Sequence, residues 1–283
     1  MERSAAASQA SAPETTPVEQ PRLSLAARMK TYEAVTDTRV PSDSPVILRL
    51  DGHSFSKFTA HFARPFDPRI HSAMVDTCAD LLHFLPSATI AYTQSDEITL
   101  VCPRGLGCFN DRVQKVGSLA AAYTSVRFNA HLSAAVAAMP EPAVRNAEMV
   151  LGSAYFDARV FGIPSVEEAL NCLVWRCRGD AVRNFVNAFA RTLFSTRELH
   201  GKRCEEVLEM MKDKGIVYEE AVPSWAVEGS IVKRELVEHV GLNGKTGEEE
   251  TTMRSRSKVV DRGLRTFSDE NLRLMVEKYC TEA

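Results

Sequence analysis

The chain has 283 residues, of which 45% are hydrophobic and 25% are charged, and its formal net charge at pH 7 is −3. This composition suits a globular chain with one large core, or a core and a satellite, and the slight negative charge excludes a general affinity for nucleic acid. RNA binding would therefore require a local basic surface. The sequence has no apolar run of about 18 residues, the length that spans a bilayer, and its start lacks the hydrophobic segment of a secretory signal. We expect a protein that acts in solution, without a membrane partner.

The cysteines indicate the compartment. There are seven, with no C-x-x-C pair and no companion histidine spacing, at positions 78, 102, 108, 172, 177, 204 and 280. An odd number without these patterns argues against a disulfide framework or a structural zinc site. We therefore expect a reducing compartment, the cytoplasm, with mitochondria as the alternative.

The first 22 residues are small, polar and proline-bearing, and this composition predicts a disordered N-terminal extension. A mitochondrial transit peptide is the alternative reading. Such peptides avoid acidic residues, whereas Glu2, Glu14 and Glu19 lie in this segment. Ordered sequence is expected to begin at residue 23.

The following segments alternate between strand and helix patterns. Residues 46–51 alternate as a strand with two unlike faces and end on Asp51. Residues 66–85 carry apolar side chains at helical spacing, which predicts a helix. Two β-rich runs within residues 88–102 flank the polar residues 94–97, and this pattern predicts a hairpin.

A second helix and strand complete the series. Residues 110–131 predict a long helix capped by Asn110 or Asp111, and residues 153–163 predict a strand that stops before Pro164. The order β-α-β-β-α-β is that of the ferredoxin-type, split βαβ arrangement. We therefore predict an α+β fold with an antiparallel sheet and flanking helices.

The C-terminal part, residues 166–283, is predicted to be mainly helical. Within it, residues 241–253 are glycine-rich but lack the spacing of a phosphate-binding loop, so they are predicted to form a mobile loop.

Two acidic turns carry the chemistry of the predicted sheet. Asp51-Gly52 ends the first strand, and Asp96 lies in the hairpin, so both carboxylates are expected at neighbouring strand ends. Converging carboxylates suit Mg²⁺, which also binds nucleotide phosphates, and two such ions can serve nucleotidyl transfer. Gly52, without a Cβ, would let backbone approach a metal or a triphosphate. Taken singly, each motif is more often a plain turn.

Several motifs resemble the histidine-tRNA guanylyltransferase superfamily of 3′-to-5′ polymerases. They keep the family's order from about Arg28 to Lys258, and they read RMKTYE, RLDGHSF, RPFD, QSDE, R-V-Q-K, YFDARVFGIP, WRCRGDAVRN, ELHGK and RSRSK. The resemblance implies a polymerase-palm-like catalytic region at residues 23–165 and a thumb-like, tRNA-binding region at residues 166–283. It also implies a homotetramer.

The resemblance further implies an enzyme that activates the 5′ end of a tRNA with ATP or GTP and then joins it to the 3′-hydroxyl of an incoming triphosphate. Two Mg²⁺ ions would be held by Asp51, Asp96 and the Gly52 carbonyl, and Asp51, Asp96 and Glu97 would be catalytic. The nucleotide-binding residues implied are Asp51, Gly52, His53, Ser54, Phe55, Ser56, Asp67, Ser95, Asp96, Arg112 and Lys115. Arg112 and Lys115 lie i, i+3 near a helix start, which is an arrangement that suits phosphate.

A basic surface is expected in the second half of the chain. The residues predicted to contact the tRNA backbone are Arg159, Arg176, Arg183, Asn184, Lys202 and Arg254. Any one of these charges alone is more often part of a solvated helix face. Trp175 lies at a basic cluster and could stack on a base, but its apolar neighbours Leu173 and Val174 favour a core residue, which is our prediction.

One difference from the founding enzymes indicates the branch of the superfamily. The founding enzymes carry a histidine where this chain has Val182, and Arg183-Asn184 follow as in the guanylyltransferase-like branch. That branch favours template-directed repair of 5′-truncated tRNA, which is our main interpretation. The alternatives are addition of a single 5′ guanosine to histidine tRNA, a nucleotide cyclase with a related palm, and a non-catalytic RNA-binding protein.

Overall fold

The structure, a computed structural model, describes residues 23–139, 149–242, 244 and 247–280. The predicted disordered extension, residues 1–22, lies outside these described residues. The chain divides into two compact units, residues 1–37 and 38–283. The first contains helix α1 (Leu25–Ala34), and all other elements belong to the second.

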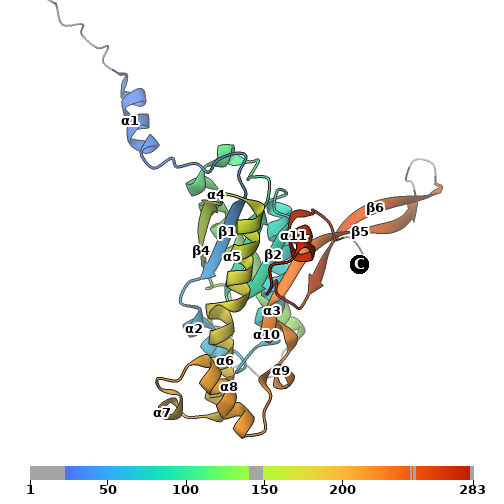
Figure 1. Ribbon diagram of the computed structural model, residues 1–283. Coiled ribbons are helices and arrows are strands. Elements are labelled where there is room, and N and C mark those ends of the chain that lie inside the picture. Colours follow the sequence, from blue (N-terminus) through green and yellow to red (C-terminus); the bar gives the residue numbers. More distant parts are fainter. Residues whose placement is uncertain (1–22, 140–148, 243, 245–246, 281–283) are drawn as a thin grey trace, which may run out of the picture. The chain divides into compact units, whose positions relative to one another are not determined.

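Four strands form the centre of the second unit (Figure 1). They are β1 (Val46–Gly52), β2 (Ile90–Gln94), β3 (Glu97–Cys102) and β4 (Phe156–Gly162). Their order is β4-β1-β3-β2, and each neighbouring pair is antiparallel. Helices α3 (Pro68–Phe84) and α4 (Val113–Ala138) complete the β-α-β-β-α-β order. The predicted α+β fold, a split βαβ antiparallel sheet with flanking helices, is confirmed.

The two long helices begin in different ways. Asp67 caps α3 by accepting a hydrogen bond from the Arg69 backbone N–H, and Pro68 occupies the first turn, where its missing N–H costs nothing. The N-cap of α4 is Arg112, without a side-chain cap. The predicted caps Asn110 and Asp111 are therefore wrong. Both belong to the 3-10 turn η2 (Phe109–Asp111) and have positive φ angles of 53° and 56°.

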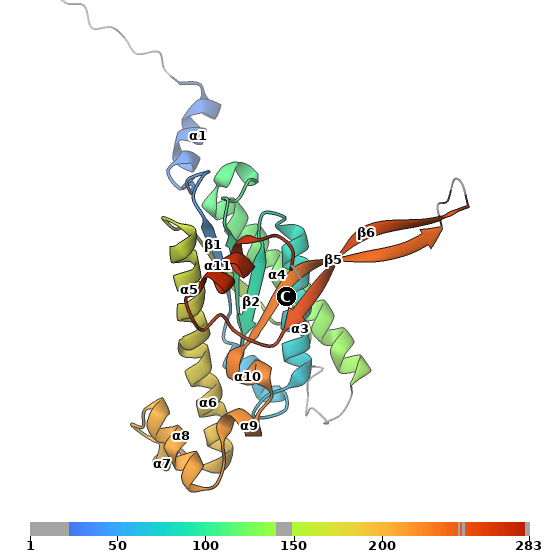
Figure 2. The same ribbon diagram turned by 45° about the vertical axis from the view of Figure 1, so that its right-hand side comes forward.

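Different helices cover the two faces of the sheet (Figure 2). Leu48 and Leu50 of β1 join a core with side chains from α3 and α4. Ile47 joins a second core with α5 (Val166–Arg178) and α11 (Asp269–Val276). Because strand side chains alternate, Arg49 and Asp51 follow Ile47 on the α5 side of β1.

A third core lies in the C-terminal part, among the helices α6 (Asp180–Leu193), α7 (Thr196–Leu199), α8 (Cys204–Asp213), α9 (Tyr218–Ala221) and α10 (Ser224–Glu228). Two further helical elements, α2 (Phe55–Phe58) and η1 (Thr59–His61), follow β1. Helix α6 has a strongly amphipathic pattern, and Val186 and Ala190 on its buried side pack against Val207 and Met211 of α8. Within the described ranges, no helix combines the length and apolar character that crossing a membrane requires.

Two strands extend the sheet beyond the predicted four. β5 (Ser230–Leu242) pairs with β2, and β6 (Glu249–Val260) pairs with β5. The C-terminal part is therefore not simply helical, and it shares one sheet with the predicted palm-like region. The predicted loop at residues 241–253 is also wrong in part, because its ends belong to these two strands.

Candidate active site

The end of β1 meets the turn between β2 and β3. The Gly52 backbone N–H donates a hydrogen bond of 3.0 Å to the Asp96 carbonyl, and Asp51 lies opposite Glu97 in the register of β1 and β3. Burial raises the pKa of Asp96 to about 6. The Ser95 hydroxyl, which donates to Asp96 Oδ1 at 2.9 Å, opposes this shift, and the charge of Asp51 adds to it. The two predicted carboxylates are thus close enough to repel each other.

This pair of carboxylates suits a divalent cation. Carboxylate oxygens are hard ligands, and a positive ion between Asp51 and Asp96 would offset the repulsion that raises the pKa of Asp96. Among the described residues, no three histidine, cysteine, aspartate or glutamate side chains gather as a complete metal site. Mg²⁺ matches this incomplete set, because it ordinarily keeps several waters and binds substrate phosphates through one or two carboxylates.

Gly52 has a structural role that the sequence did not indicate. A Cβ at this position would lie 2.3 Å from the Phe55 ring, so the ring fills the space beside the glycine. The next residues turn sharply. The His53 N–H donates to the Tyr155 carbonyl at 2.9 Å, and Ser54 has a positive φ of 53°. Gly52 is therefore required for the packing of Phe55, and the space beside its Cα is not open to a ligand.

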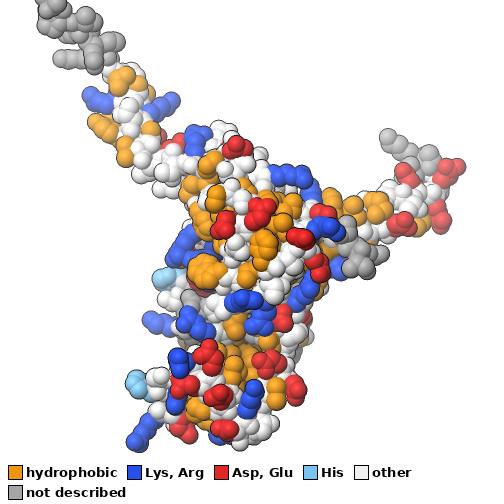
Figure 3. All heavy atoms as spheres, in the orientation of Figure 1, with side chains coloured by type: hydrophobic (Ala, Val, Ile, Leu, Met, Phe, Trp, Pro, Cys, Tyr) orange, Lys and Arg blue, Asp and Glu red, His pale blue; other side chains and the backbone are white. Residues whose placement is uncertain are grey.

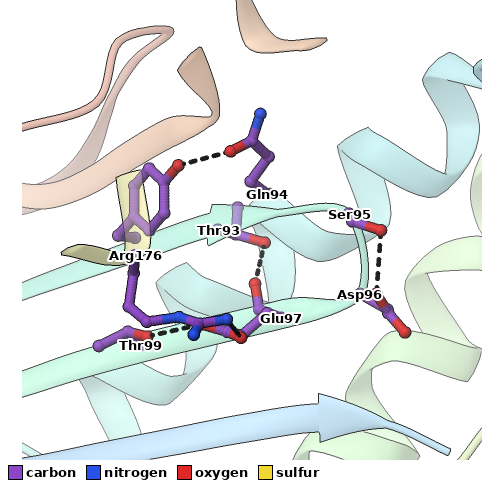
Figure 4. A network of polar contacts seen from close by, with 8 residues as sticks. Thr93, Gln94, Ser95, Asp96, Glu97, Thr99 and Arg176 are labelled. Carbon is purple, nitrogen blue, oxygen red and sulfur yellow. Dashed lines mark hydrogen bonds and ion pairs between the residues drawn. The ribbon is translucent and has the colours of Figure 1, made fainter. Parts of the chain in front are cut away.

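Glu97 and Arg176 form a buried ion pair (Figure 4). Arg176 of α5 donates from Nε to Glu97 Oε1 at 2.6 Å and from Nη2 to Oε2, and the Thr99 hydroxyl donates to Oε1 at 3.3 Å. Figure 4 shows this carboxylate joined to Arg176, while Asp96 bonds to Ser95. Arg176 and Glu97 are thus buried and bonded to each other, which gives both side chains a structural role. The tRNA contact predicted for Arg176 and the catalytic role predicted for Glu97 stay predictions.

A cavity of about 540 Å³ opens beside Ser95 and Asp96. Its volume lies within the range of small-molecule sites. From the predicted nucleotide-binding set it includes Phe55, Ser56, Asp67, Ser95 and Asp96, and from the predicted tRNA-binding set it includes Asn184. The structure thus brings five of the predicted nucleotide-binding residues and one predicted tRNA contact together at one cavity.

Aromatic side chains form one wall of this cavity. Trp225 of α10 stacks on His71 with ring centroids 4.2 Å apart, and Phe66 packs against Phe185 of α6 at 4.7 Å. Burial lowers the pKa of His71 to about 4, although the charge of Asp261 opposes the shift, so His71 is neutral at pH 7. Sequence reasoning missed this wall, since only folding brings Trp225 and Phe185 beside Phe66.

Asp67 supports the cavity from within the protein. It is buried, accepts from Arg69 Nε at 2.9 Å and from the Ala63 N–H at 2.9 Å, and forms an ion pair with Arg69. Although burial opposes ionisation, these hydrogen bonds lower the pKa of Asp67. Asp67 therefore holds the loop before α3 in place.

Arg112 and Lys115 lie at the other end of the sheet. The Val40 backbone N–H donates a hydrogen bond to the carbonyl of Asp111, the residue before Arg112. Val40 also lies next to Gly162, which pairs with Val46, the first residue of β1. The length of β1, roughly 20 Å, separates this end from Asp51. The structure does not bring these two cations to the carboxylate pair.

The other predicted tRNA contacts are dispersed. Arg183 and Asn184 are exposed on α6, Arg254 is exposed on β6, and Lys202 lies 3.5 Å from Glu206. Trp175, predicted as a core residue, is 58% exposed, and Arg176 Cζ lies 4.7 Å from its ring centroid. That prediction is wrong, because α5 turns its apolar residues Leu173 and Cys177 inward instead.

Arg159 of β4 has a neighbour that sequence reasoning missed. Arg49 of β1 is its register partner, so the two arginines lie side by side on the face that also carries Asp51. Arg159 is exposed, whereas Arg49 Nε is buried and has no hydrogen-bond partner among the described residues. Two adjacent cations make this a candidate contact for an anion, with Asp51 and its register partner Asp157 beside them on the same face.

Comparison with known proteins gives a consistent result. A family model described as "tRNAHis guanylyltransferase" matches residues 26–164. "Uncharacterized protein R259" of Acanthamoeba polyphaga mimivirus is 30% identical over 89% of each chain. The tRNA(His) guanylyltransferase of Neurospora crassa is 28% identical over 76% of this chain and 74% of its own.

Solved structures share the fold. A bacterial tRNA(His) guanylyltransferase (Thg1)-like protein in complex with ATP aligns with a TM-score of 0.63 and 28% identity, covering 74% of this chain and 88% of that chain. The same kind of protein in complex with GTP aligns with a TM-score of 0.58 and 26% identity, covering 84% and 91%. The chain belongs to the tRNAHis guanylyltransferase family.

Proposed function

We propose that this protein adds nucleotides to the 5′ end of tRNA in the 3′-to-5′ direction, after ATP or GTP has activated that end. The observation that carries the proposal is the pair Asp51 and Asp96 at adjoining strand ends, with Asp96 and Ser95 lining a cavity of nucleotide size. The family membership and the relatives solved with ATP and GTP support the same chemistry.

We assign a separate role to each group of residues in the site. Asp51 and Asp96 would hold two Mg²⁺ ions, which when bound stabilise the charge on the attacking and leaving oxygens. The aromatic wall binds the nucleotide base by stacking, and this leaves the phosphates directed towards Ser95 and Asp96. Arg49 and Arg159 bind phosphate of the RNA 5′ end beside Asp51.

Stacking on the aromatic wall is tested by changing Trp225. Trp225→Leu is expected to raise the KM for the nucleotide about tenfold, since an aromatic contact with a base contributes roughly 1–3 kcal/mol. Trp175→Leu is the matched control, because Trp175 is the other tryptophan of the chain and does not line the cavity. Steady-state kinetics with varied nucleotide check this, and equal KM values in the two variants would argue against base stacking on Trp225.

The arginine pair is tested by RNA affinity. Arg49→Gln and Arg159→Gln are each expected to weaken tRNA binding several-fold and to reduce the slope of log affinity against log salt by about one unit. The KM for ATP should not change. Filter binding at several salt concentrations makes the measurement, and Arg104→Gln, which alters an exposed arginine beyond the far end of β3, serves as control. An unchanged salt slope would remove the pair from the RNA site.

We place the chain in the guanylyltransferase-like branch, which repairs 5′-truncated tRNA by templated addition. Val182 supports this, since it cannot supply the imidazole of the founding enzymes, and so does the likeness to bacterial Thg1-like proteins. The test supplies Mg²⁺, ATP and all four nucleoside triphosphates with tRNAs truncated at the 5′ end. Addition that follows the opposite strand is the expected result, and addition of one unpaired guanosine to full-length histidine tRNA alone would reverse the branch assignment.

Two further proposals concern the setting of the protein. A reducing compartment, the cytoplasm or mitochondria, is supported by seven cysteines that are all free thiols. A homotetramer is proposed from the family resemblance.

A further inference from the structure

Three cross-strand pairs of polar or aromatic side chains line one face of β1 and β4. They are Arg49 with Arg159, Asp51 with Asp157, and His53 with Tyr155. The His53 N–H donates to the Tyr155 carbonyl at 2.9 Å, one step along the ladder beyond Gly52 and Phe156. Phe156 points into the core with α3 and α4, so alternation sets Tyr155 on the face that carries Asp51. Figure 3 shows basic side chains and a histidine at the surface on the β4 side of the molecule.

The rings of His53 and Tyr155 form a stack at the sheet edge. Their centroids lie 4.9 Å apart with 19° between the ring planes. This distance matches the spacing of neighbouring strands, about 4.8 Å, so the stack runs across the strands. His53 covers one face of the Tyr155 ring, and the other face is directed past β4, which is an edge strand of the described six-stranded sheet. Tyr155 is 55% exposed, so an aromatic face is available to a ligand beside Asp51.

Hydrogen bonds to α4 hold the backbone on both sides of Tyr155. The Asn129 side chain accepts from the Ala154 N–H at 3.2 Å and donates to the Ala154 carbonyl at 2.7 Å. The Phe156 N–H donates to the Ser125 hydroxyl at 3.1 Å. Because the residues before and after Tyr155 are fixed to one helix, the ring can bind a ligand with little further loss of conformational freedom.

The charges around the stack indicate the class of ligand. A nucleobase is neutral and presents a π face, so it can stack on Tyr155 beside Asp51 and Asp157, whereas these carboxylates would repel a free anion. Arg49 and Arg159 lie about 13 Å further along the same face, where they suit the phosphates of a chain that carries such a base. The face therefore fits a nucleobase that is attached to a polyphosphate backbone.

We infer that the 5′-terminal base of the RNA stacks on the exposed face of Tyr155. Among the described residues that line the cavity at Ser95 and Asp96, neither His53 nor Tyr155 occurs, so the stack is separate from the place proposed for the free nucleotide. Only the end base of a strand has a face without a neighbouring base, and every base has a π face, so this contact selects an RNA end and not a sequence. The inference rests on the proposed function, which supplies the RNA 5′ end as the ligand.

A double-perturbation cycle in RNA binding tests the stack. Tyr155→Leu and, separately, an abasic nucleotide at the 5′ end of a truncated tRNA are each expected to weaken binding about tenfold, since each removes one contact between a base and an aromatic ring. The two changes together should weaken binding little more than either alone, because both remove the same contact. Tyr155→Phe keeps the ring and is the matched control, which should bind as the unaltered protein does. Filter binding in the absence of nucleotide makes the measurement, and circular dichroism establishes that both variants are folded.

The outcomes separate this inference from the proposed function. Losses that add fully in the combined experiment, or a Tyr155→Leu protein that binds as tightly as the unaltered one, would overturn the stack even where nucleotide addition proceeds. An effect of Tyr155→Leu confined to the KM for the incoming nucleotide would assign the ring to that nucleotide and overturn the assignment to RNA. Coupled losses in a protein that adds no nucleotide would support the stack and contradict the proposed function.

Discussion

Asp51→Asn and Asp96→Asn are each expected to reduce nucleotide addition by at least about 10³-fold, because each removes one of the two carboxylates proposed to hold the Mg²⁺ ions. The substitutions keep the size and shape of the side chain, and Asp51 and Asp96 lie at strand ends outside the apolar cores. Incorporation of labelled GTP into tRNA, with protein concentration matched, measures the loss. Activity near that of the unaltered protein in either variant would remove this carboxylate pair from the chemistry.

The stability of Asp96→Asn distinguishes lost chemistry from lost structure. Burial raises the pKa of Asp96 from 3.8 to about 6, so its ionised form costs folding free energy above that pH. The unfolding free energy contributed by this group falls as pH rises from about 4 to about 6. At pH 7 without divalent metal, the asparagine variant should therefore be more stable by up to roughly 3 kcal/mol, since one pKa unit corresponds to about 1.4 kcal/mol. Urea unfolding in the presence of chelator tests this, and a marked loss of stability would mean that the activity loss reflects damage to the fold.

The second large effect concerns the buried ion pair of Glu97 and Arg176. Arg176→Ala is expected to destabilise the protein by about 3–5 kcal/mol, because it leaves the Glu97 carboxylate buried without its partner. Arg178→Ala, which removes an exposed arginine from the same helix, should change the unfolding free energy by less than about 0.5 kcal/mol. Urea unfolding of both variants makes the comparison.

A double replacement isolates the ion pair from its surroundings. Glu97→Gln combined with Arg176→Met removes both charges and keeps most of the buried volume, so it should recover much of the stability that Arg176→Ala loses. If Arg176 instead contacts tRNA, Arg176→Ala would lower tRNA affinity at full stability. That outcome would restore the role that the sequence suggested.

The local features of the fold were predictable from the sequence. Alternation in residues 46–51 and helical spacing in residues 66–85 arise from contacts with the adjoining layers, so they leave a pattern in the chain itself. The turn that holds Asp96 was marked by polar residues between two apolar runs. The β-α-β-β-α-β order then placed Asp51 and Asp96 at adjacent strand ends.

The remaining features depend on contacts between distant residues. Glu97 and Arg176 are 79 residues apart, and the partner of a buried charge cannot be read from local sequence. Trp225 and Phe185 reach the cavity only through the packing of α6 and α10. The outer parts of β5 and β6, residues 236–242 and 249–255, were missed because most of their side chains are exposed. The burial that normally produces a strand pattern is therefore absent there.

Arg112 and Lys115 show the limit of transferring a site by resemblance. Their spacing near a helix start suits phosphate, yet α4 begins at the far end of the sheet from Asp51. Arg49, by contrast, lies two residues before Asp51 on the same face of β1, and it became a candidate only when the register of β1 with β4 set it beside Arg159.

The direction of addition tests the central claim most directly. A 5′-truncated tRNA whose 3′ terminal ribose has been oxidised cannot be extended at its 3′ end, and it can be incubated with the protein, Mg²⁺, ATP and α-labelled GTP. We predict full incorporation, with nuclease digestion locating the label at the 5′ terminus. Incorporation that disappears on 3′ oxidation, or a labelled cyclic nucleotide formed without RNA, would contradict the proposed 3′-to-5′ addition.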